Sequence, residues 1–378
     1  MNLTTLGLKN FRNINESFLK FSPNLNIFIG ENGQGKTNFL EAIHFLIQGE
    51  SFRYGDYSTI IQFGYPATLL RASIQKNDYD YQVDFKIANN KKEIFINNKK
   101  TTKPENYLPP IILFSPESLS VIKESADERR KLLDDLIITS LKNGSQFITE
   151  FKKALKTRNR LLKDISEEKI DRNTGVQTLE SLNQIYFSLS AHLTYQRIKA
   201  LQDIRPLVQE ALQKIEIRNS QVEFDFSYVI SDQKIVDNNE ENHFNLMKKR
   251  QQELFLAELS AGVSLVGPQK HDVIFLYNGN DSRFFSSQGQ QRSIILAFKI
   301  AQIVYHYRVN GFYPILLLDD VLSELDQYKQ SSLVSTLNEI ETQTFLTSTD
   351  IDVLKKLSID KSFIYKVVNG NIESKTDK

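Results

Sequence analysis

The stretch GENGQGKT at residues 30–37 decides the fold, because it matches the pattern G-x-x-x-x-G-K-[ST] at every fixed position. The apolar residues 25–29 before it predict a short buried strand, and residues 38–47 after it predict an amphipathic helix. A glycine-rich loop in that context turns its backbone N–H groups toward phosphate oxygens. The sequence therefore predicts a nucleoside triphosphate site.

Two side chains of this loop carry specific roles in the prediction. Lys36 is its only side-chain cation and is expected to reach the β- and γ-phosphates, while the Thr37 hydroxyl is expected to bind Mg²⁺. The residues predicted to line the nucleotide are Gly30, Glu31, Asn32, Gly33, Gln34, Gly35, Lys36, Thr37 and Asn38.

Composition limits what surrounds the loop. The chain has 378 residues, of which 40% are hydrophobic, so it can bury a large core and is expected to form two lobes. The absence of cysteine excludes disulfides, thiolate nucleophiles and cysteine-bound zinc, and the five histidines lack metal-ligand spacing. The sequence shows neither a signal peptide nor a membrane span, which predicts a cytoplasmic protein.

Hydrophobic periodicity changes along the chain. Residues 1–29 and 67–114 alternate as strands do, with a hairpin expected at 89–92. Residues 127–165 and 179–193 have helical spacing, and Pro206 is expected to kink or end a segment. Together with an expected strand at 222–230 and a charged helix at 240–259, this predicts an α/β body with an inserted, mainly helical lobe.

A second motif, ILLLDD at residues 315–320, has the form of a Walker B strand, which is expected to lie beside the strand of the phosphate loop. Asp319 is then predicted to hold Mg²⁺, and Asp320 to act on the attacking water as general base, so that Asp320 and Lys36 are the predicted catalytic residues. The alternative is a buried strand followed by an acidic cap.

A third motif, SSQGQQR at residues 286–292, directly precedes an expected helix. A serine hydroxyl, backbone N–H groups and a helix dipole at one point form an anion site. The alternative is a serine that only caps the helix.

These motifs resemble a known superfamily. The segment SQGQ at 287–290 resembles the signature of ABC-type ATPases, and SELD at 323–326 resembles their D-loop. Within that superfamily the chain resembles the RecF family of bacterial recombination-repair ATPases. The segments that carry this resemblance are LKNFRN at 8–13, ILFSPESL at 112–119, ERRKLLD at 128–134, VGPQKHD at 266–272 and QGQQR at 288–292.

The resemblance implies an ABC-type P-loop ATPase head formed by residues 1–125 and 262–378, with the helical lobe at 126–261 between them. It also implies an ATP-dependent homodimer in which the signature of one chain closes on the γ-phosphate held by the other. The residues that it adds to the nucleotide site are Arg12, Ser287, Gly289, Gln290 and Asp326. For Arg12, a solvated side chain after a strand is the alternative.

The function implied is that of an ATP-dependent clamp in recombinational repair. Such a protein binds duplex DNA near single-strand gaps and works with RecO and RecR to load RecA. Because most ABC ATPases have Glu where this chain has Asp320, hydrolysis is expected to be slow. The alternatives are a nucleotide-switched DNA-binding module with incidental hydrolysis, and a short SMC- or Rad50-like head.

Two segments depart from the family pattern. The usual GPHRDD reads GPQKHD at residues 267–272, so the chain departs from the family pattern at residues Gln269 to His271. Lys270 still supplies a cation where the family has Arg. The segment TSTD at 347–350 follows an expected strand where ABC proteins place a switch histidine, and it contains none.

DNA contacts are predicted from local charge, because the formal net charge is only +1. Residues 86–103 contain six lysines and one acidic residue, and residues 152–163 contain six basic residues and no acidic one. Such clusters bind the phosphate backbone without reading sequence, although a solvated face is the alternative. The candidates are Lys91, Lys92, Lys99, Lys100, Lys152, Lys153, Lys156, Arg158 and Arg160.

Overall fold

The computed structural model describes residues 1–53, 56–76, 79–102, 104, 107–141, 143–216, 221–230, 233–235, 238–349 and 362–377. Two compact units are present: Met1–Leu119 with His306–Lys378, and Ser120–Tyr305. The second unit is therefore an insertion in the sequence of the first.

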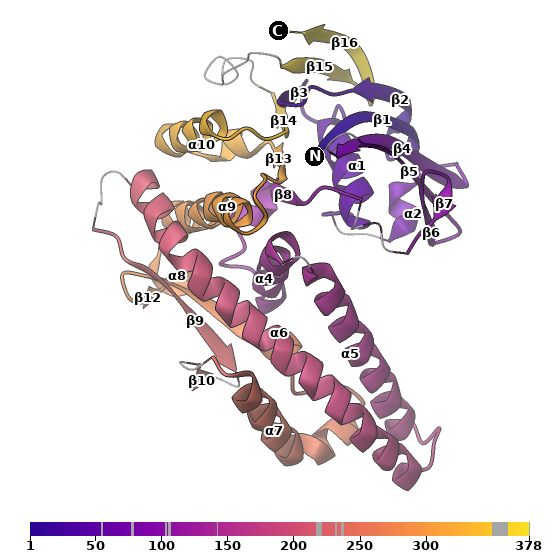
Figure 1. Cartoon of the computed structure of the whole chain (residues 1–378), viewed down its shortest axis with the longest axis vertical. Helices are drawn as coiled ribbons and strands as arrows, with labels where there is room; N and C mark the ends of the chain where they lie inside the picture. Colours follow the sequence, from indigo (N-terminus) through magenta and orange to yellow (C-terminus); the bar gives the residue numbers. More distant parts are fainter. Residues whose placement is uncertain are drawn as a thin grey trace. The chain divides into compact units, whose positions relative to one another are not determined.

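The first unit contains an antiparallel six-stranded sheet with the order β2-β1-β4-β5-β6-β7 (Figure 1). The predicted hairpin is confirmed: β5 and β6 are joined at Asn89 and Asn90, whose φ angles of 50° and 57° suit a left-handed turn. The strands are β1 (Asn2–Phe11), β2 (Ile14–Lys20), β4 (Ala67–Lys76), β5 (Tyr79–Ala88), β6 (Lys91–Ile96) and β7 (Lys99–Lys100).

The second sheet of this unit has the order β16-β15-β3-β14-β13-β8, and its five strands from β15 to β8 are parallel. Its strands are β3 (Leu25–Ile29), β8 (Ile111–Phe114), β13 (Ile315–Asp319), β14 (Thr344–Ser348), β15 (Phe363–Val368) and β16 (Asn371–Asp377). The expectation that the Walker B strand lies beside the loop strand is wrong, because β14 pairs with both β3 and β13 and separates them.

Helix α1 (Lys36–Gln48) contacts strands of both sheets, so its buried side chains join the two into one core. Burial of Phe39, Phe45 and Leu46, each fully enclosed, is a large part of what holds this unit together. The other helices of the unit are α2 (Tyr57–Ile60), α3 (Pro116–Leu119), the 3-10 helix η3 (Val321–Glu324) and α10 (Gln327–Glu339).

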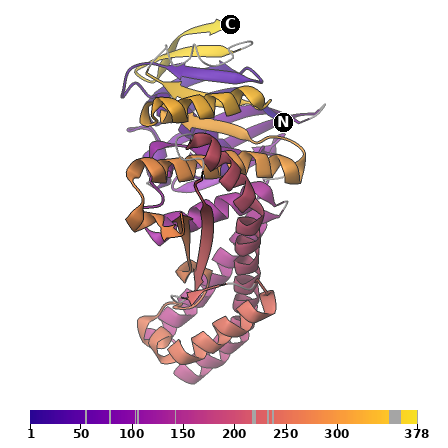
Figure 2. The same ribbon diagram turned by 90° about the vertical axis from the view of Figure 1, so that its left-hand side faces the viewer.

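The second unit is mainly helical. The long helices α5, α6 and α7 pack along one another, and β9 runs along α6 (Figures 1 and 2). Its helices are α4 (Ala126–Ser140), α5 (Gly144–Ser166), α6 (Arg172–Ile215), α7 (Glu240–Ala261), the 3-10 helix η2 (Pro268–Lys270), α8 (Ser282–Phe285) and most of α9 (Gln288–Asn310). Its small sheet has the order β10-β9-β11-β12, formed by β10 (Gln233–Lys234), β9 (Phe224–Ile230), β11 (Asp272–Tyr277) and β12 (Asn280–Asp281).

Pro206 lies inside α6 and does not end it. The residues after it, Leu207, Val208 and Leu212, are all buried. Their packing compensates for the hydrogen bond that the proline removes, and the helix continues to Ile215.

Among the helices of the described ranges, none combines the length and the apolar character needed to cross a lipid bilayer.

The compact units divide the chain differently from the predicted lobes. The second unit begins at Ser120, close to the expected boundary at residue 126, but it ends at Tyr305. Residues 262–305, including the segment that resembles an ABC signature, therefore pack with the helical unit.

Candidate nucleotide site

Lys36 is the first residue of α1, directly after the loop that follows β3. Its side chain is buried, and its ammonium group donates to the carbonyl oxygens of Gly30 at 2.8 Å and Glu31 at 2.9 Å. Burial lowers the pKa of Lys36, while the carboxylates of Asp320 and Asp319 oppose that shift. The loop thus directs a cation at the place where phosphate oxygens would be held.

At two positions of the loop a side chain would clash with a neighbouring segment, so only glycine fits there. Gly35 has a φ of 103°, and a Cβ there would lie 2.8 Å from the side chain of Asn13. A Cβ on Gly30 would lie 2.5 Å from the carbonyl oxygen of Val367 on β15. Asn13 in turn accepts a hydrogen bond of 2.7 Å from Asn38 at the start of α1. The loop can take this shape because it carries no side chain at either position.

The C-terminal hairpin holds the loop from one side. At its turn the N–H of Gly370 donates to the carbonyl oxygen of Gln34, and the N–H of Asn369 donates to Gln34 Oε1, both at 2.7 Å. Neither Asn369 nor Gly370 is among the site residues predicted from the sequence. The Asn-Gly pair was visible as a turn signal between β15 and β16, but nothing in the sequence placed that turn against the loop.

Thr37 on α1 and Asp319 on β13 meet although β3, the strand before α1, does not pair with β13. The Thr37 hydroxyl donates to Asp319 Oδ1 at 2.9 Å, and Thr347 donates to the same oxygen at 2.8 Å. Burial raises the pKa of Asp319, and these two hydroxyls oppose the rise. A hydroxyl and a carboxylate at one point are the hard oxygen donors that Mg²⁺ prefers, so Thr37 and Asp319 could hold it.

Asp320 follows Asp319 at the end of β13 with a left-handed backbone, φ 47°. Its N–H donates to the Thr347 hydroxyl at 2.8 Å, and its carbonyl oxygen accepts a hydrogen bond of 2.7 Å from Ser323. Thr347 is not among the site residues predicted from the sequence. The signal that could have found it is a hydroxyl residue at the end of an apolar strand. Asp350, at the end of that segment, lies outside the described residues.

Arg12 has a structural partner. Its guanidinium binds the fully buried carboxylate of Glu41 on α1 through two hydrogen bonds of 3.0 and 2.5 Å, and it donates to the carbonyl oxygen of Thr59 at 2.7 Å. The solvated arginine considered as the alternative is thus not what the structure shows. A contact between Arg12 and a nucleotide stays a prediction.

Both motifs that resemble ABC dimer contacts cap helices. Ser287 Oγ accepts from the N–H of Gln290 at 3.3 Å, and Gln290 Oε1 accepts from the N–H of Ser287 at 2.8 Å, at the start of α9. Asp326 caps α10 by accepting from the N–H groups of Tyr328 and Lys329, and it forms an ion pair of 2.7 Å with Lys329. Gly289 lies between the two capping residues of α9.

Comparison with known proteins places this geometry in a family. The model of the RecF/RecN/SMC N-terminal domain matches residues 2–373. The protein named DNA replication and repair protein RecF from Lactobacillus acidophilus is 33% identical, with 98% of each chain covered, and that from Lactobacillus johnsonii is 31% identical over 99% of this chain and 100% of its own.

The chain belongs to the RecF family.

Solved structures agree with this assignment. A RecF–ATP structure matches with a TM-score of 0.86 at 29% identity, covering 99% of this chain and 97% of its own. An SMC head bound to the C-terminal winged-helix domain of ScpA matches with a TM-score of 0.57 at 14% identity, covering 100% and 98% of the two chains, which is a likeness of fold alone. The predicted fold class, an α/β ABC-type ATPase head with an inserted helical lobe, is confirmed.

In this RecF-family chain the departures at Gln269 to His271 fall in the helical unit. Gln269 accepts a hydrogen bond of 3.1 Å from Tyr186, and His271 is buried with its Nδ1 3.1 Å from the Tyr228 hydroxyl. Burial lowers the pKa of His271 well below its ordinary value, so this histidine is neutral. Lys270 between them is exposed.

One predicted DNA contact of this RecF-family chain is wrong. Arg158 has no exposed side-chain surface, and it binds Glu258, equally buried, through bonds of 3.0 and 2.6 Å. It faces into the packing of α5 against α7 and cannot reach DNA. The exposed candidates are Lys91, Lys92, Lys99, Lys100, Lys152, Lys153, Lys156 and Arg160.

Part of the first basic segment lines a hollow of about 510 Å³. Its charged lining residues are Lys86, Lys91, Lys92, Lys100 and Glu93. Lys92 also donates to the carbonyl oxygen of Gly49 at the end of α1, and Lys100 pairs with Glu93 at 2.6 Å. Four lysines against one glutamate make this surface of the RecF-family chain locally cationic.

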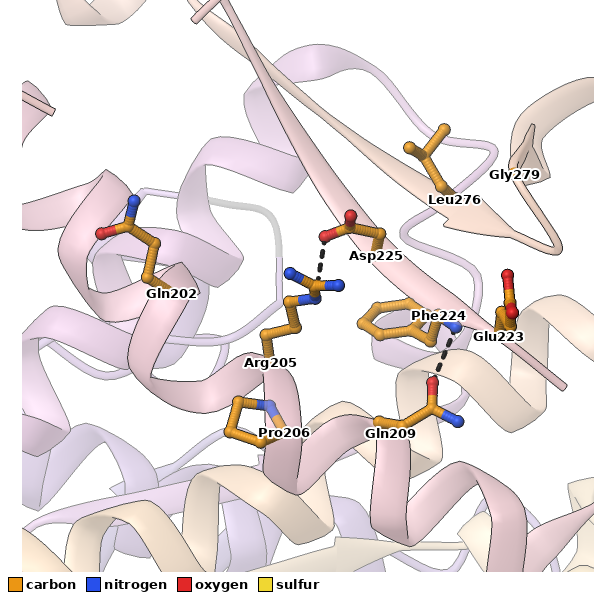
Figure 3. Close-up of a pocket in the computed structure, with 9 residues that line it drawn as sticks. All are labelled: Gln202, Arg205, Pro206, Gln209, Glu223, Phe224, Asp225, Leu276 and Gly279. Atoms are coloured by element: carbon orange, nitrogen blue, oxygen red, sulfur yellow. Dashed lines mark hydrogen bonds and ion pairs between the residues drawn. The ribbon is translucent and has the colours of Figure 1, made fainter. Parts of the chain in front are cut away.

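A larger hollow of about 640 Å³ lies in the helical unit between α6, β9 and β11 (Figure 3). Arg205 and Asp225 form an ion pair of 3.0 Å across it, and Gln209 accepts a hydrogen bond of 2.7 Å from the N–H of Phe224. It contains none of the motif residues. These polar groups link α6 to β9.

Proposed function

We propose that the protein is an ATP-dependent DNA-binding clamp in recombinational DNA repair, reset by slow ATP hydrolysis. The observation that carries the proposal is the 2.9 Å bond between Thr37 of the phosphate loop and Asp319 of the Walker B strand, with the Lys36 ammonium inside the same loop. Solved RecF structures named as ATP and ATPrS complexes share this fold and support ATP as the ligand.

Each motif residue has one task in this proposal. Lys36 and the N–H groups of residues 30–38 bind the phosphates, and Thr37 and Asp319 hold Mg²⁺, which supplies charge stabilisation when bound. Asp320 takes the proton of the attacking water as general base. Its side chain is one methylene shorter than the usual Glu, and turnover is therefore slow.

Dimer formation completes the site in this proposal. Residues 262–378 act with residues 1–125 as the ATPase lobe, and 126–261 form the inserted lobe. The signature residues Ser287, Gly289 and Gln290 contact the γ-phosphate bound to a second copy, while Asp326 belongs to the D-loop. The exposed aromatic side chains of Phe284 and Phe285 beside the signature, and of Tyr328 beside the D-loop, support an interface there.

DNA is bound through phosphates, by the exposed lysines of β6, β7 and α5. Relatives are named DNA replication and repair proteins, and the solved RecF is described as a recombination mediator in the RecFOR pathway. We extend this to a preference for duplex DNA at single-strand gaps and to RecO and RecR as partners in loading RecA.

The test follows DNA release and phosphate release together. Wild type and Asp320→Asn are loaded on gapped duplex with ATP and Mg²⁺, with Lys36→Met as the variant that should not bind ATP at all. We expect hydrolysis to fall by about 100-fold in Asp320→Asn, the range of a lost general base. We also expect its dimers to remain on DNA, where raising the salt concentration weakens binding.

Two outcomes would refute parts of the proposal. Wild-type hydrolysis by Asp320→Asn would remove this residue from the role of base. Equal dissociation of both proteins from DNA despite blocked hydrolysis would mean that hydrolysis is incidental to release, as in a nucleotide-switched binding module.

A further inference from the structure

Thr347 lies at the carboxyl end of β14, the strand that separates the two motif strands. Its position in the sheet register is directly opposite Asp319 on β13 and Phe28 on β3. Only 1% of its surface is exposed. The side chain therefore reaches the Asp319 carboxylate and the Asp320 backbone from the middle of the sheet, where it has little freedom to move.

The Thr347 hydroxyl makes two hydrogen bonds of fixed direction. A backbone N–H can only donate, so the hydroxyl oxygen accepts from Asp320 at 2.8 Å. Its single hydrogen is then left for Asp319 Oδ1, also at 2.8 Å. One atom thus holds the carboxylate of the first acid and the backbone of the second.

The hydrogen bond from the Asp320 N–H to Thr347 helps to hold Asp320 in a strained backbone conformation. Asp320 has a φ of 47°, a conformation that residues other than glycine rarely adopt. The N–H bond to Thr347 and the Ser323 hydroxyl on the carbonyl oxygen hold the two sides of this residue. Loss of either bond gives Asp320 a route back to an ordinary backbone conformation, which would turn its carboxylate in a new direction.

The two threonines that donate to Asp319 have different roles once Mg²⁺ is bound in the proposed site. Thr37 also donates to Oδ1, but in the proposed site its hydroxyl turns to Mg²⁺ and leaves the carboxylate. Thr347 has no such second task, because β14 holds it beside Asp319 throughout. Its hydroxyl is then the one that keeps Oδ1 oriented.

We propose that Thr347 is a positioning residue for ATP hydrolysis, which sets the direction of Asp319 and Asp320 through one hydroxyl group. This inference rests on the proposed roles of those two acids. Thr347 itself touches neither the phosphates nor the water. It lies in the segment where ABC proteins place a switch histidine, but it acts on the acids.

Three variants test this. Thr347→Val keeps the shape and removes the hydroxyl, Thr347→Ser keeps the hydroxyl, and Thr344→Val removes a buried hydroxyl at the other end of the same strand. At saturating Mg²⁺ we expect Thr347→Val to lower kcat by about tenfold or more with KM for ATP within about twofold, since Thr347 is not among the residues proposed to bind ATP. Thr347→Ser should retain about a third or more of wild-type kcat, and Thr344→Val should match wild type.

The Mg²⁺ dependence of ATP binding, followed by calorimetry, gives a readout that needs no hydrolysis. We expect Thr347→Val to need several-fold more Mg²⁺ for half-saturation, because Asp319 is no longer held. If Thr347→Val does not fold, as judged by circular dichroism, Thr347→Ala with the same measurements replaces it.

The outcomes separate this inference from the proposed function. Wild-type kcat and Mg²⁺ dependence in Thr347→Val, while Asp320→Asn is inactive, would overturn the inference and leave the function standing. Loss in Thr347→Val with no effect of Asp320→Asn would remove Asp320 as base and keep Thr347 acting through Asp319. If the wild type does not hydrolyse ATP, the proposed function fails and the role of Thr347 in hydrolysis fails with it, whereas the Mg²⁺ measurement still tests whether Thr347 orients Asp319.

Discussion

Arg158 shows that a charged residue in a basic segment can stabilise the interior of the protein and not bind a ligand at its surface. Its guanidinium binds Glu258 and Ser264, and lies 5.0 Å from the ring centre of Tyr186. Removal of one member of a buried ion pair leaves the other charge without compensation. In the sequence, Arg158 is one of six basic residues in 152–163 and cannot be told apart from its exposed neighbours.

We predict that Arg158→Ala lowers the free energy of unfolding of the helical unit by about 3–5 kcal/mol. Lys156→Ala, two residues earlier on the exposed face of α5, should change it by less than about 0.5 kcal/mol. Urea unfolding of both variants measures this. Equal unfolding midpoints for the two would contradict the role assigned to the buried pair.

Asp319 is expected to destabilise the nucleotide-free protein. A carboxyl group whose pKa is raised on folding contributes stability that is complete below its ordinary pKa of 3.8 and lost as the pH rises through the raised value. Asp319→Asn, which can still accept both threonine hydrogen bonds, should raise Tm at neutral pH by about 2–4 °C, the effect of ~1 kcal/mol.

The gain from Asp319→Asn should shrink as the pH falls toward 3.8, because the wild-type carboxyl then becomes neutral as well. Asp326→Asn is the matched comparison. Burial acts to raise the pKa of Asp326, but Lys329 and two backbone N–H groups lower it overall, so this variant should gain nothing. Thermal unfolding at several pH values tests both, and a lower Tm for Asp319→Asn at neutral pH would contradict the argument.

At the scale of elements, the turn of the C-terminal hairpin governs the phosphate loop. Gly370 has a φ of 78°, and a Cβ there would lie 2.4 Å from the carbonyl oxygen of Asn13. Gly279 in the turn between β11 and β12 has nearly the same φ, 75°, and is also preceded by Asn, but a Cβ there meets nothing within 4 Å. The two turns thus share a left-handed backbone conformation, which strains any residue other than glycine, and differ in what lies beside them.

We predict that Gly279→Ala and Gly370→Ala each lose about 1–2 kcal/mol of stability from the left-handed backbone. Gly370→Ala must also move the turn away from Asn13, which pulls its two hydrogen bonds off Gln34. ATP affinity should therefore fall by about tenfold, or ~1.4 kcal/mol, in that variant alone. Calorimetric titration with ATP measures it, and equal affinities would show that the hairpin does not shape the loop.

Most helices and strands could be predicted from local sequence patterns, because neighbouring residues determine whether a segment forms a helix or a strand. The charged helix expected at 240–259 is α7, and the strand expected at 222–230 is β9. The continuation of α6 past Pro206 and the place of β14 between β3 and β13 depend on partners far away in the sequence. For the same reason the loop and the two acids were recognisable as motifs, whereas Thr347 and Asn369, whose roles come from packing, were not.

At the scale of the whole molecule, the proposed dimer predicts that a signature substitution acts on the second copy. Ser287→Arg should leave ATP binding by the monomer within about twofold of wild type, because no residue of that motif contacts its own phosphate loop in the proposal. It should prevent ATP-induced dimers, which light scattering would detect. Ser181→Arg, at an exposed serine on α6, is the control and should dimerise normally.

The insertion of one unit within the other has a consequence for biosynthesis. Strand β3, which leads into the phosphate loop, pairs with β14 and β15, and both follow the helical unit in the sequence. The antiparallel sheet, whose strands all precede residue 101, can form early, whereas β3 stays a bare apolar edge while the helical unit is being translated. A nascent chain should thus remain unable to bind nucleotide, and open to chaperones, until β14 and β15 have been synthesised.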